Sequence, residues 1–226
     1  MKLAARWINR SDRAEEGVWV QPPVGGAYKR AFDVCGALAG IVLLAPLLVM
    51  LAALVKCSDG GSIVYRHRRI GRSGRVFDCL KFRTMAENGD AVLEEYLARN
   101  PESREEWRLT RKLKHDPRVT GVGAVLRKLS LDELPQIFNI LLGDMSIVGP
   151  RPVVKQELEM YGPAARYYLQ TRPGLTGLWQ ISGRNDVSYR QRVAFDTHYV
   201  ENWSPGFDLL IIVRTFPAVY ASRGSY

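Results

Sequence analysis

The sequence predicts an α-rich α+β fold attached to one face of a membrane, a monotopic protein with a small β-hairpin and interfacial amphipathic helices. Three observations lead to this prediction: an apolar run at residues 31–55 with a proline near its middle, short β-branched runs separated by Gly and Ser at residues 60–85, and an apolar stretch at residues 207–220. We expect three segments, which are a polar N-terminal tail (1–27), a re-entrant membrane helix (28–57) and a domain on the cytoplasmic face (58–226).

Length and charge limit what this chain can be. Its 226 residues are enough to bury the core of one domain. It carries 32 Lys and Arg against 23 Asp and Glu, a net charge of +9, so the partner is expected to be anionic: nucleic acid, an anionic membrane surface or a phosphorylated substrate. The three cysteines and three histidines lack disulfide or zinc-ligand spacing, whereas a hard cation held by carboxylates fits the composition.

Residues 31–55 are long enough to cross a membrane. A straight helix of this length would reach about 37 Å at about 1.5 Å per residue, more than a hydrocarbon core of about 30 Å. However, Pro46 removes a helix hydrogen bond near the middle, and basic residues flank both ends, so the positive-inside rule gives no orientation. A helix that enters the bilayer, bends at Pro46 and returns to the cytoplasmic side satisfies both facts, and a kinked spanning helix is the alternative.

A β-hairpin is expected next, with strands at residues 63–66 and 76–81 around a Gly-Arg-Ser-Gly turn at 71–74. A group of arginines in this segment lies close to the membrane entry, where cations attract anionic headgroups. These arginines are Arg66, Arg68, Arg69, Arg72 and Arg75.

Two cations at the end of this hairpin predict a different role. Lys81 and Arg83 alternate with Phe82, so in an extended strand their side chains share one face. Such a pair is suited to holding a phosphate.

The polar stretch at residues 87–114 is expected to be a solvated helical insertion. Its few apolar residues are helically spaced, and Asn100-Pro101 interrupts the pattern. We assign no chemistry to it.

The stretch SLDELPQ, at residues 130–136, allows two interpretations. Ser130 and Glu133 match a capping box, and acidic residues are favoured in the first turn of a helix. If instead Leu131 or Asp132 caps the helix, Pro135 falls within the first turn, and the carboxylates stand at a helix start that also attracts anions.

In the second interpretation the carboxylates have a chemical role. Arg127 precedes them and Arg151 follows, so a phosphate could be drawn to the same place. An ionised Asp132 could then attack phosphorus while Glu133 holds Mg²⁺.

The run LRKLSLDELPQIFNILLGDMSIVGPRP, with KFRTM before it and RPGLTGLWQISGRNDVSYRQRVAFDTHYV after it, resembles the bacterial sugar transferases that initiate exopolysaccharide and capsule assembly. These enzymes are monotopic phosphoglycosyl transferases, and the resemblance extends from Tyr28 to the C-terminus. It is greatest to rhizobial enzymes that transfer galactose 1-phosphate to undecaprenyl phosphate. The resemblance implies that Asp132 is the nucleophile that takes the phosphosugar from a UDP-sugar and releases UMP, and that Glu133 binds Mg²⁺.

The resemblance also implies binding roles for several basic residues. Lys81, Arg83, Arg127 and Arg151 would line the phosphate site. An alternative for Arg151 is an ion pair with a carboxylate such as Asp144.

Two further positions carry implied roles. Arg184 lies in a loop that could reach the nucleotide or sugar, although a local pair with Asp186 would also explain it. Pro46 matches the proline at which the family's re-entrant helix bends. Ala45 stands where a serine often precedes that proline, so no hydroxyl is present to bond a freed carbonyl.

The expected partners are therefore a UDP-hexose, undecaprenyl phosphate, Mg²⁺ and membrane lipids, at the cytoplasmic face of the bacterial inner membrane. Galactose is favoured over glucose by the overall likeness. Nucleic acid is not expected, because the basic residues cluster beside the apolar run and the two carboxylates and are not interleaved with stacking aromatics. A catalytically inactive scaffold of the polysaccharide assembly machinery is the alternative function. The sequence leaves the oligomeric state and the downstream glycosyltransferases open.

Overall fold

The computed structural model describes residues 23–110, 113–183 and 187–220, and in these ranges the chain is rich in helix. The strands of the described ranges form two small two-stranded sheets, β1-β2 and β3-β4. The elements in chain order are α1 (Gly26–Asp59), β1 (Val64–Ile70), η3 (Arg72–Gly74), β2 (Val76–Phe82), α2 (Gly89–Arg99), α3 (Pro101–Thr110), α4 (Gly121–Lys128), η4 (Leu131–Glu133), α5 (Gln136–Leu142), β3 (Ser146–Val148), α6 (Lys155–Glu159), η5 (Gly162–Ala164), α7 (Ala165–Gln170), β4 (Gly174–Thr176), α8 (Leu178–Ile181), α9 (Tyr189–Glu201) and α10 (Pro205–Tyr220).

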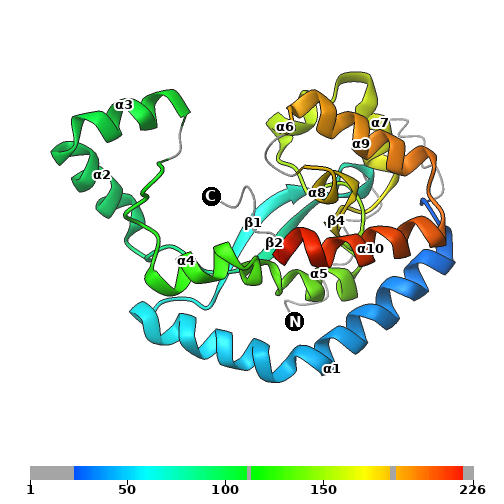
Figure 1. The fold of residues 1–226 in the computed structure, drawn as a ribbon, viewed down its shortest axis with the longest axis horizontal. Coiled ribbons are helices and arrows are strands. Elements are labelled where there is room, and N and C mark those ends of the chain that lie inside the picture. The colour runs from blue at the N-terminus through cyan, green and yellow to red at the C-terminus, as the bar shows by residue number, and fades with distance from the viewer. Residues whose placement is uncertain (1–22, 111–112, 184–186, 221–226) are drawn as a thin grey trace, which may run out of the picture.

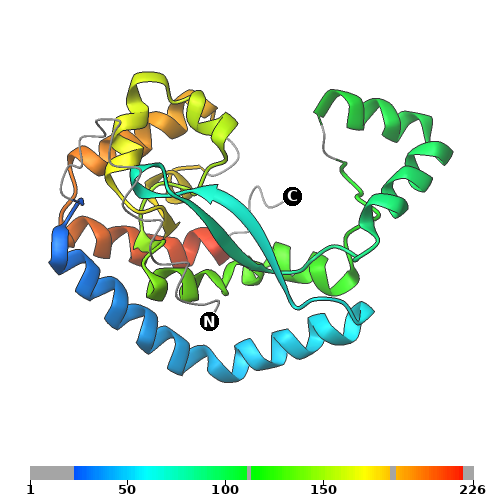
Figure 2. The same cartoon turned by 180° about the vertical axis from the view of Figure 1, so that it is seen from behind.

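Helix α1 lies along one edge of the molecule as a single curved helix that continues through Pro46 (Figures 1 and 2). Left-handed glycines, Gly25 and Gly60, bound it at both ends. It is long and apolar enough to cross a membrane, and only 11% of its most apolar 18-residue window is buried inside the protein. A core helix would bury most of this surface, so α1 has the properties of a helix that contacts lipid.

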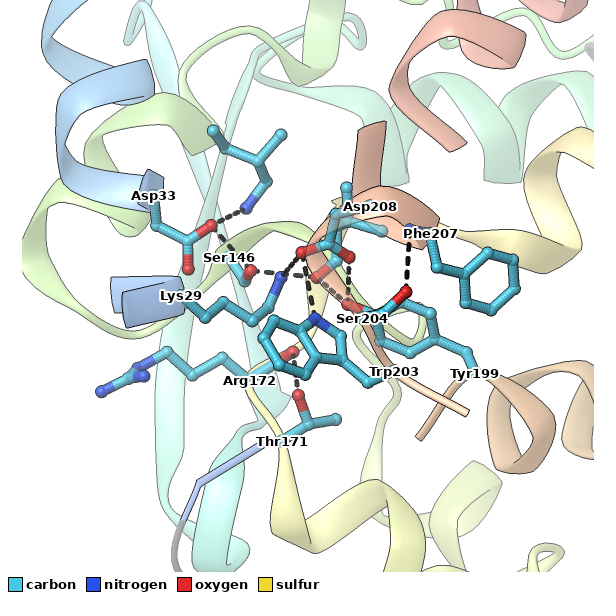
Figure 3. A network of polar contacts seen from close by, with 12 residues as sticks. Lys29, Asp33, Ser146, Thr171, Arg172, Tyr199, Trp203, Ser204, Phe207 and Asp208 are labelled. Carbon is cyan, nitrogen blue, oxygen red and sulfur yellow. Dashed lines mark hydrogen bonds and ion pairs between the residues drawn. The ribbon is translucent and has the colours of Figure 1, made fainter. Parts of the chain in front are cut away.

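The N-terminal end of α1 is fastened to α10 by a buried ion pair (Figure 3). Lys29 Nζ lies 2.6 Å from Asp208 Oδ2, and both side chains are at most 4% exposed. Asp208 also accepts hydrogen bonds from the Tyr199 hydroxyl at 2.8 Å and from the Trp203 indole at 3.1 Å. Because a buried charge pair is tolerated only when its other hydrogen-bonding groups are satisfied, these four side chains form one unit.

Asp33, one turn further along α1, is bound by a different element. Its Oδ1 accepts hydrogen bonds from Ser146 Oγ at 2.9 Å and from the backbone N–H of Ile147 at 3.0 Å, both in β3. The neighbouring cation Lys29 pairs with Asp208 and not with Asp33. Arg30 donates instead to the carbonyls of residues 140 and 141 at the C-terminal end of α5.

The C-terminal end of α1 packs on the same domain through apolar contacts. Leu51 and Val55 form a buried cluster with Phe82 of β2 and Leu126 of α4. Both ends of the apolar helix therefore contact the body that carries the rest of the chain, while its middle exposes large apolar side chains such as Val42 and Leu43.

The predicted hairpin is confirmed and is longer than expected. Strands β1 and β2 pair antiparallel from Val64 opposite Phe82 to Ile70 opposite Val76, so the first strand extends four residues beyond position 66. Phe77 and Cys79 of β2 enter a buried cluster with α5 and α1. The alternation of side chains places Lys81 on the face of Cys79.

Helix α5 is tied to β2 by one buried amide. Asn139 accepts a hydrogen bond from the Leu80 N–H at 2.9 Å and donates to the Asp78 carbonyl at 2.8 Å. Such bonds stand in for a missing partner strand at this edge of the hairpin. They fix the start of α5 relative to Lys81.

The helical insertion is confirmed, with α2 and α3 separated at Asn100 and standing away from the rest of the molecule (Figure 1). Helix α10 buries Asp208 and Ile211 and exposes an apolar face, as the interfacial prediction requires. The exposed apolar side chains of α10 are Leu209, Leu210, Val213 and Phe216.

We expect Lys29→Met to destabilise the protein by about 3–5 kcal/mol, because it leaves the Asp208 carboxylate buried without its cation. The measurement is thermal unfolding of the detergent-solubilised protein. The double variant Lys29→Met/Asp208→Asn, which removes both charges, should recover most of the loss. A single variant that melts with the parent would show that the pair contributes nothing.

Candidate active site

The adjacent carboxylates Asp132 and Glu133 lie in the short 3-10 turn η4, between α4 and α5. Ser130, before them, has the left-handed backbone (φ 56°, ψ 20°) that residues other than Gly, Asn and Asp rarely adopt, and its side chain makes no capping hydrogen bond. The capping-box interpretation of Ser130 is therefore wrong. Helix α5 begins only after Pro135, so the turn presents the two carboxylates ahead of the helix.

Lys81 is the cation that faces the two carboxylates. Its Nζ lies 2.6 Å from Glu133 Oε1 and 3.8 Å from Asp132 Oδ2. The lysine comes from β2 and the carboxylates from η4, so the fold joins residues about fifty positions apart. Helix α5, which follows the turn, is bound to β2 by Asn139, and this bond supports the contact.

Asp132 is 9% exposed, whereas the Glu133 side chain is 32% exposed. Burial raises the pKa of Asp132, Lys81 and Arg127 act to lower it, and the negative charge of Glu133 raises it. Removal of either cation would therefore shift Asp132 further toward its protonated form.

The predicted basic residues divide into two groups. Arg127, in the last turn of α4, donates from Nε to Thr84 Oγ1 at 2.9 Å and acts electrostatically on Asp132. Arg83 pairs with Asp59 at the end of α1, so Lys81 and Arg83 hold different carboxylates. One guanidinium nitrogen of Arg83, Nη1, is buried without a hydrogen-bond partner, and a phosphate role for this residue stays a prediction.

A pocket beside Glu133 brings in Arg151. Lys81, Glu133 and Arg151 all line it. The loop that carries Arg151 crosses β4 closely: Gly174 N–H bonds the Pro150 carbonyl at 2.8 Å, and a Cβ on Gly174 would lie 2.1 Å from the backbone nitrogen of Gly149. Only glycine fits this crossing.

Arg151 itself lies over the Trp179 ring at 5.2 Å. Among the described residues it forms no ion pair, with Asp144 or any other carboxylate. Its charge is therefore available to an anion that enters the pocket.

The pocket contains residues that the sequence analysis did not assign to it. Arg69 lines it and pairs with Glu157 at 3.2 Å, although it was grouped with arginines expected at the headgroups. Strand alternation could have found it, because Arg69 lies opposite Phe77 on the face of Lys81. Gln136 and Gln180 also line the pocket, and no sequence signal singled them out. Arg184 lies outside the described residues.

Asp132 and Glu133 form a donor set that fits magnesium. In the described part of the chain no three His, Cys, Asp or Glu side chains cluster as a metal site would require. Mg²⁺ is commonly bound by one or two carboxylates, with water and substrate phosphates completing the octahedron. The Glu133 side chain is more exposed than the Asp132 side chain. Its contact with the Lys81 ammonium group shows that this position favours a positive charge.

A buried carboxylate stands behind the pocket. Asp196 of α9 accepts a hydrogen bond from the Tyr161 hydroxyl at 2.7 Å, and burial raises the pKa of Asp196 to about 7. The charges of Arg192 and Arg151 act to lower this pKa. Arg192 also lies over Trp179, at 4.4 Å, so the tryptophan is shared by two guanidinium groups.

Comparison with known proteins identifies the family to which this chain belongs. The family model described as bacterial sugar transferase matches residues 24–222. The chain is 62% identical over 226 residues to the exopolysaccharide production protein ExoY of Rhizobium meliloti (strain 1021), with 100% of both chains covered.

Two other relatives carry names that state a reaction. The chain is 50% identical over 198 residues to the undecaprenyl-phosphate galactose phosphotransferase of Salmonella typhimurium, covering 88% of this chain and 41% of that protein. It is 39% identical over 210 residues to the UDP-glucose:undecaprenyl-phosphate glucose-1-phosphate transferase of Caulobacter vibrioides, covering 88% of this chain and 72% of that protein.

We expect Asp196→Asn to remove a pH dependence of stability. The pKa of Asp196 is about 7 in the folded protein and about 3.8 when unfolded, so the folded state binds the extra proton and stability falls as pH rises from about 4 to about 7. The asparagine still accepts the Tyr161 hydrogen bond but cannot ionise. Its melting temperature at pH 8 should exceed the parent's by about 5 °C, and the two should converge toward pH 4.

Asp90→Asn, at an exposed position of α2, is the matched control and should follow the parent at every pH. Parallel parent and Asp196→Asn curves from pH 4 to 8 would contradict the raised pKa.

Proposed function

Because this chain belongs to the bacterial sugar transferase family, we propose that it transfers a hexose 1-phosphate from a UDP-sugar to undecaprenyl phosphate, the first step in assembly of an exopolysaccharide repeat unit. One observation carries the proposal. A buried Asp132, an adjacent Glu133 and Lys81 at 3.8 and 2.6 Å from them meet beside a pocket lined by Arg69 and Arg151. This is a carboxylate nucleophile beside a phosphate-binding surface.

In the first step an Asp132 carboxylate oxygen forms a bond to the phosphorus that carries the sugar. The bond between this phosphorus and the bridging oxygen of the diphosphate breaks, and UMP leaves with the electron pair. Lys81, Arg127 and Arg151 keep phosphate charge close to the carboxylate, and Lys81 and Arg127 also favour the ionised form of Asp132. A magnesium ion held by Glu133 and the diphosphate would neutralise charge on the phosphate oxygens.

In the second step a phosphate oxygen of undecaprenyl phosphate attacks the same phosphorus and releases the Asp132 carboxylate. The lipid product then carries the hexose on a diphosphate, and the enzyme returns to its starting state. Because the first product leaves before the second substrate reacts, the kinetics are ping-pong.

Galactose is the favoured sugar. The relative named for galactose is 50% identical to this chain, and the one named for glucose is 39% identical. The basic groups of the pocket suit phosphate and do not distinguish the two sugars, so this preference rests on likeness alone.

We further propose that α1 is re-entrant and that the catalytic domain, residues 58–226, lies on the cytoplasmic face of the bacterial inner membrane. Both ends of α1 contact this domain, through Lys29 at one end and Leu51 and Val55 at the other. A helix that crossed the bilayer would separate its ends by the hydrocarbon thickness of about 30 Å, with the domain able to contact only one of them. A re-entrant helix places Asp132 at a height where a soluble nucleotide sugar and a lipid phosphate can both reach it.

Asp132→Asn should lower UMP release by on the order of 10³-fold or more, because the amide is a far weaker nucleophile toward phosphorus than the carboxylate it replaces. The assay uses detergent-purified protein with UDP-galactose or UDP-glucose, undecaprenyl phosphate and Mg²⁺. Removal of the metal by EDTA should also stop the reaction.

Asp90→Asn serves as control for the same chemical change at an exposed position and should keep parental activity. A parent that releases no UMP from any UDP-sugar would favour the inactive scaffold. An Asp132→Asn variant with full activity would remove the nucleophile from the mechanism.

The re-entrant topology predicts that both ends of α1 react from one side of the membrane. Cys57 is exposed near one end, and Tyr28→Cys adds a thiol at a residue that is 68% exposed near the other. In oriented membrane vesicles, a membrane-impermeant maleimide should label both sites from the cytoplasmic side. Cys35 is also an exposed thiol, so Cys57 is labelled in a Cys35→Ser background and the new thiol in a Cys35→Ser/Cys57→Ser background. Labelling from opposite sides would establish a spanning helix.

A further inference from the structure

Gln136, the first residue of α5, is buried in an unusual way. It is only 2% exposed, yet its side-chain amide makes no hydrogen bond to any other residue in the described part of the chain. It lines the same pocket as Lys81, Glu133 and Arg151. The amide atoms of Gln136 are not among the fully buried atoms that lack a partner, so the small surface that this residue exposes includes its amide. A polar group that is exposed only to a pocket is available to a ligand or to water.

Asn139, one turn later on the same helix, provides the contrast. It is equally buried, at 2% exposed, and both ends of its amide are hydrogen-bonded to β2. Helix α5 can therefore satisfy a buried amide where its role is structural. The amide of Gln136 has no such bonds to the described part of the chain, and its position lines the pocket.

The position of Gln136 relative to the two carboxylates is fixed by the backbone. Leu134 and Pro135 have right-handed helical angles, so the chain from η4 into α5 turns continuously. The backbone hydrogen bonds through this turn join residues three apart, as in a 3-10 helix, so Gln136 lies on the face of Glu133, with which it lines the pocket. A second amide lines the pocket: Gln180 donates from Nε2 to the Leu175 carbonyl at 3.2 Å, and its Oε1 is buried without a partner.

We propose that the Gln136 amide binds a hydroxyl group of the hexose, with Gln180 as a second contact, and so positions the sugar for attack at its phosphate. This inference rests on the proposed function. The cations Lys81, Arg69 and Arg151 suit the phosphates, whereas an uncharged amide offers one donor group and one acceptor, the pair that a sugar hydroxyl matches. The sugar is joined through a single oxygen to the phosphorus that Asp132 attacks, so its ring lies close to the pocket that Glu133 and Gln136 line.

The uracil ring is the other part of the substrate with an edge that an amide can bind. It lies beyond the second phosphate and the ribose, further from the attacked phosphorus. The two assignments differ in one measurable respect, because UMP retains the uracil and lacks the hexose.

The test is Gln136→Met, which keeps the side-chain length and removes the amide. We expect kcat/KM for the UDP-hexose to fall about tenfold or more, the value for one lost hydrogen bond to an otherwise buried group. The ratio of activity on UDP-galactose to that on UDP-glucose should change and inhibition by UMP should not. The melting temperature should stay equal, because the amide makes no hydrogen bond within the described part of the chain that the substitution could remove. Gln156→Met, the same change at an exposed position of α6, should match the parent in all respects.

Each other outcome overturns the assignment in an identifiable way. Parental kcat/KM on both sugars would exclude a role for the amide in binding. Weaker inhibition by UMP, in proportion to the change in KM, would assign the amide to uracil. A lower melting temperature with activity reduced only in proportion to the folded fraction would show a structural role.

Failure of the proposed function itself would look different. In that case the parent and Gln156→Met would also release no UMP. Calorimetric titration of the parent and Gln136→Met with UDP-galactose and with UMP needs no turnover, so it decides the amide assignment separately: weaker binding of UDP-galactose alone supports it, and equal binding of both ligands overturns it.

Discussion

The buried ion pair between Lys29 and Asp208 is the interaction on which the arrangement of this protein depends. It joins residues 179 positions apart and fastens the apolar helix α1 to the last helix of the domain. Two charges removed from water are stable only if their remaining hydrogen-bonding groups are satisfied, and Tyr199 and Trp203 complete the set around Asp208. The helix that contacts lipid is therefore part of the catalytic body and is not a flexible anchor, so the fold sets the distance between the membrane and the active site.

A short series of contacts links this ion pair to the two carboxylates of the active site, Asp132 and Glu133. Arg30, next to Lys29, holds the C-terminal end of α5 through two carbonyls, and Asn139 in the same helix holds β2. Lys81 lies on β2, and Asp132 lies in the turn η4 that leads into α5, so their 3.8 Å separation depends on the same helix that α1 supports. A displacement of α1 would therefore be transmitted to Lys81 and Asp132 through α5. Phosphoryl transfer requires that the reacting and binding groups are held in place in this way before the substrate binds.

The sequence predicted the features that local patterns encode. The apolar helix, the hairpin and the helical insertion all follow from hydrophobic periodicity and turn residues, and the Asp132–Glu133 dyad stood out through its basic surroundings. Features that depend on distant residues could not be predicted. Asp208 gave no sign that it would meet Lys29, and Arg83 left the face of Lys81 because the strand ends at Phe82 and Asp59 lies within reach. Of the two interpretations of Ser130, the capping box is wrong, because that pattern describes side-chain types and does not predict the left-handed backbone that the residue adopts.

The electrostatics of the site explain why a protein with a net charge of +9 places two carboxylates side by side. Burial of Asp132 raises its pKa, which opposes the ionised form that a nucleophile needs, and Glu133 adds to the effect. Lys81 and Arg127 act in the opposite direction and also attract the anionic substrate. If phosphate charge enters the pocket it competes for the same cations, so a site with only enough positive charge to balance its carboxylates would lose the ionised nucleophile on binding substrate. Further cations that are not paired with the dyad, Arg69 and Arg151, line the pocket and can take up that charge while Lys81 stays with the carboxylates.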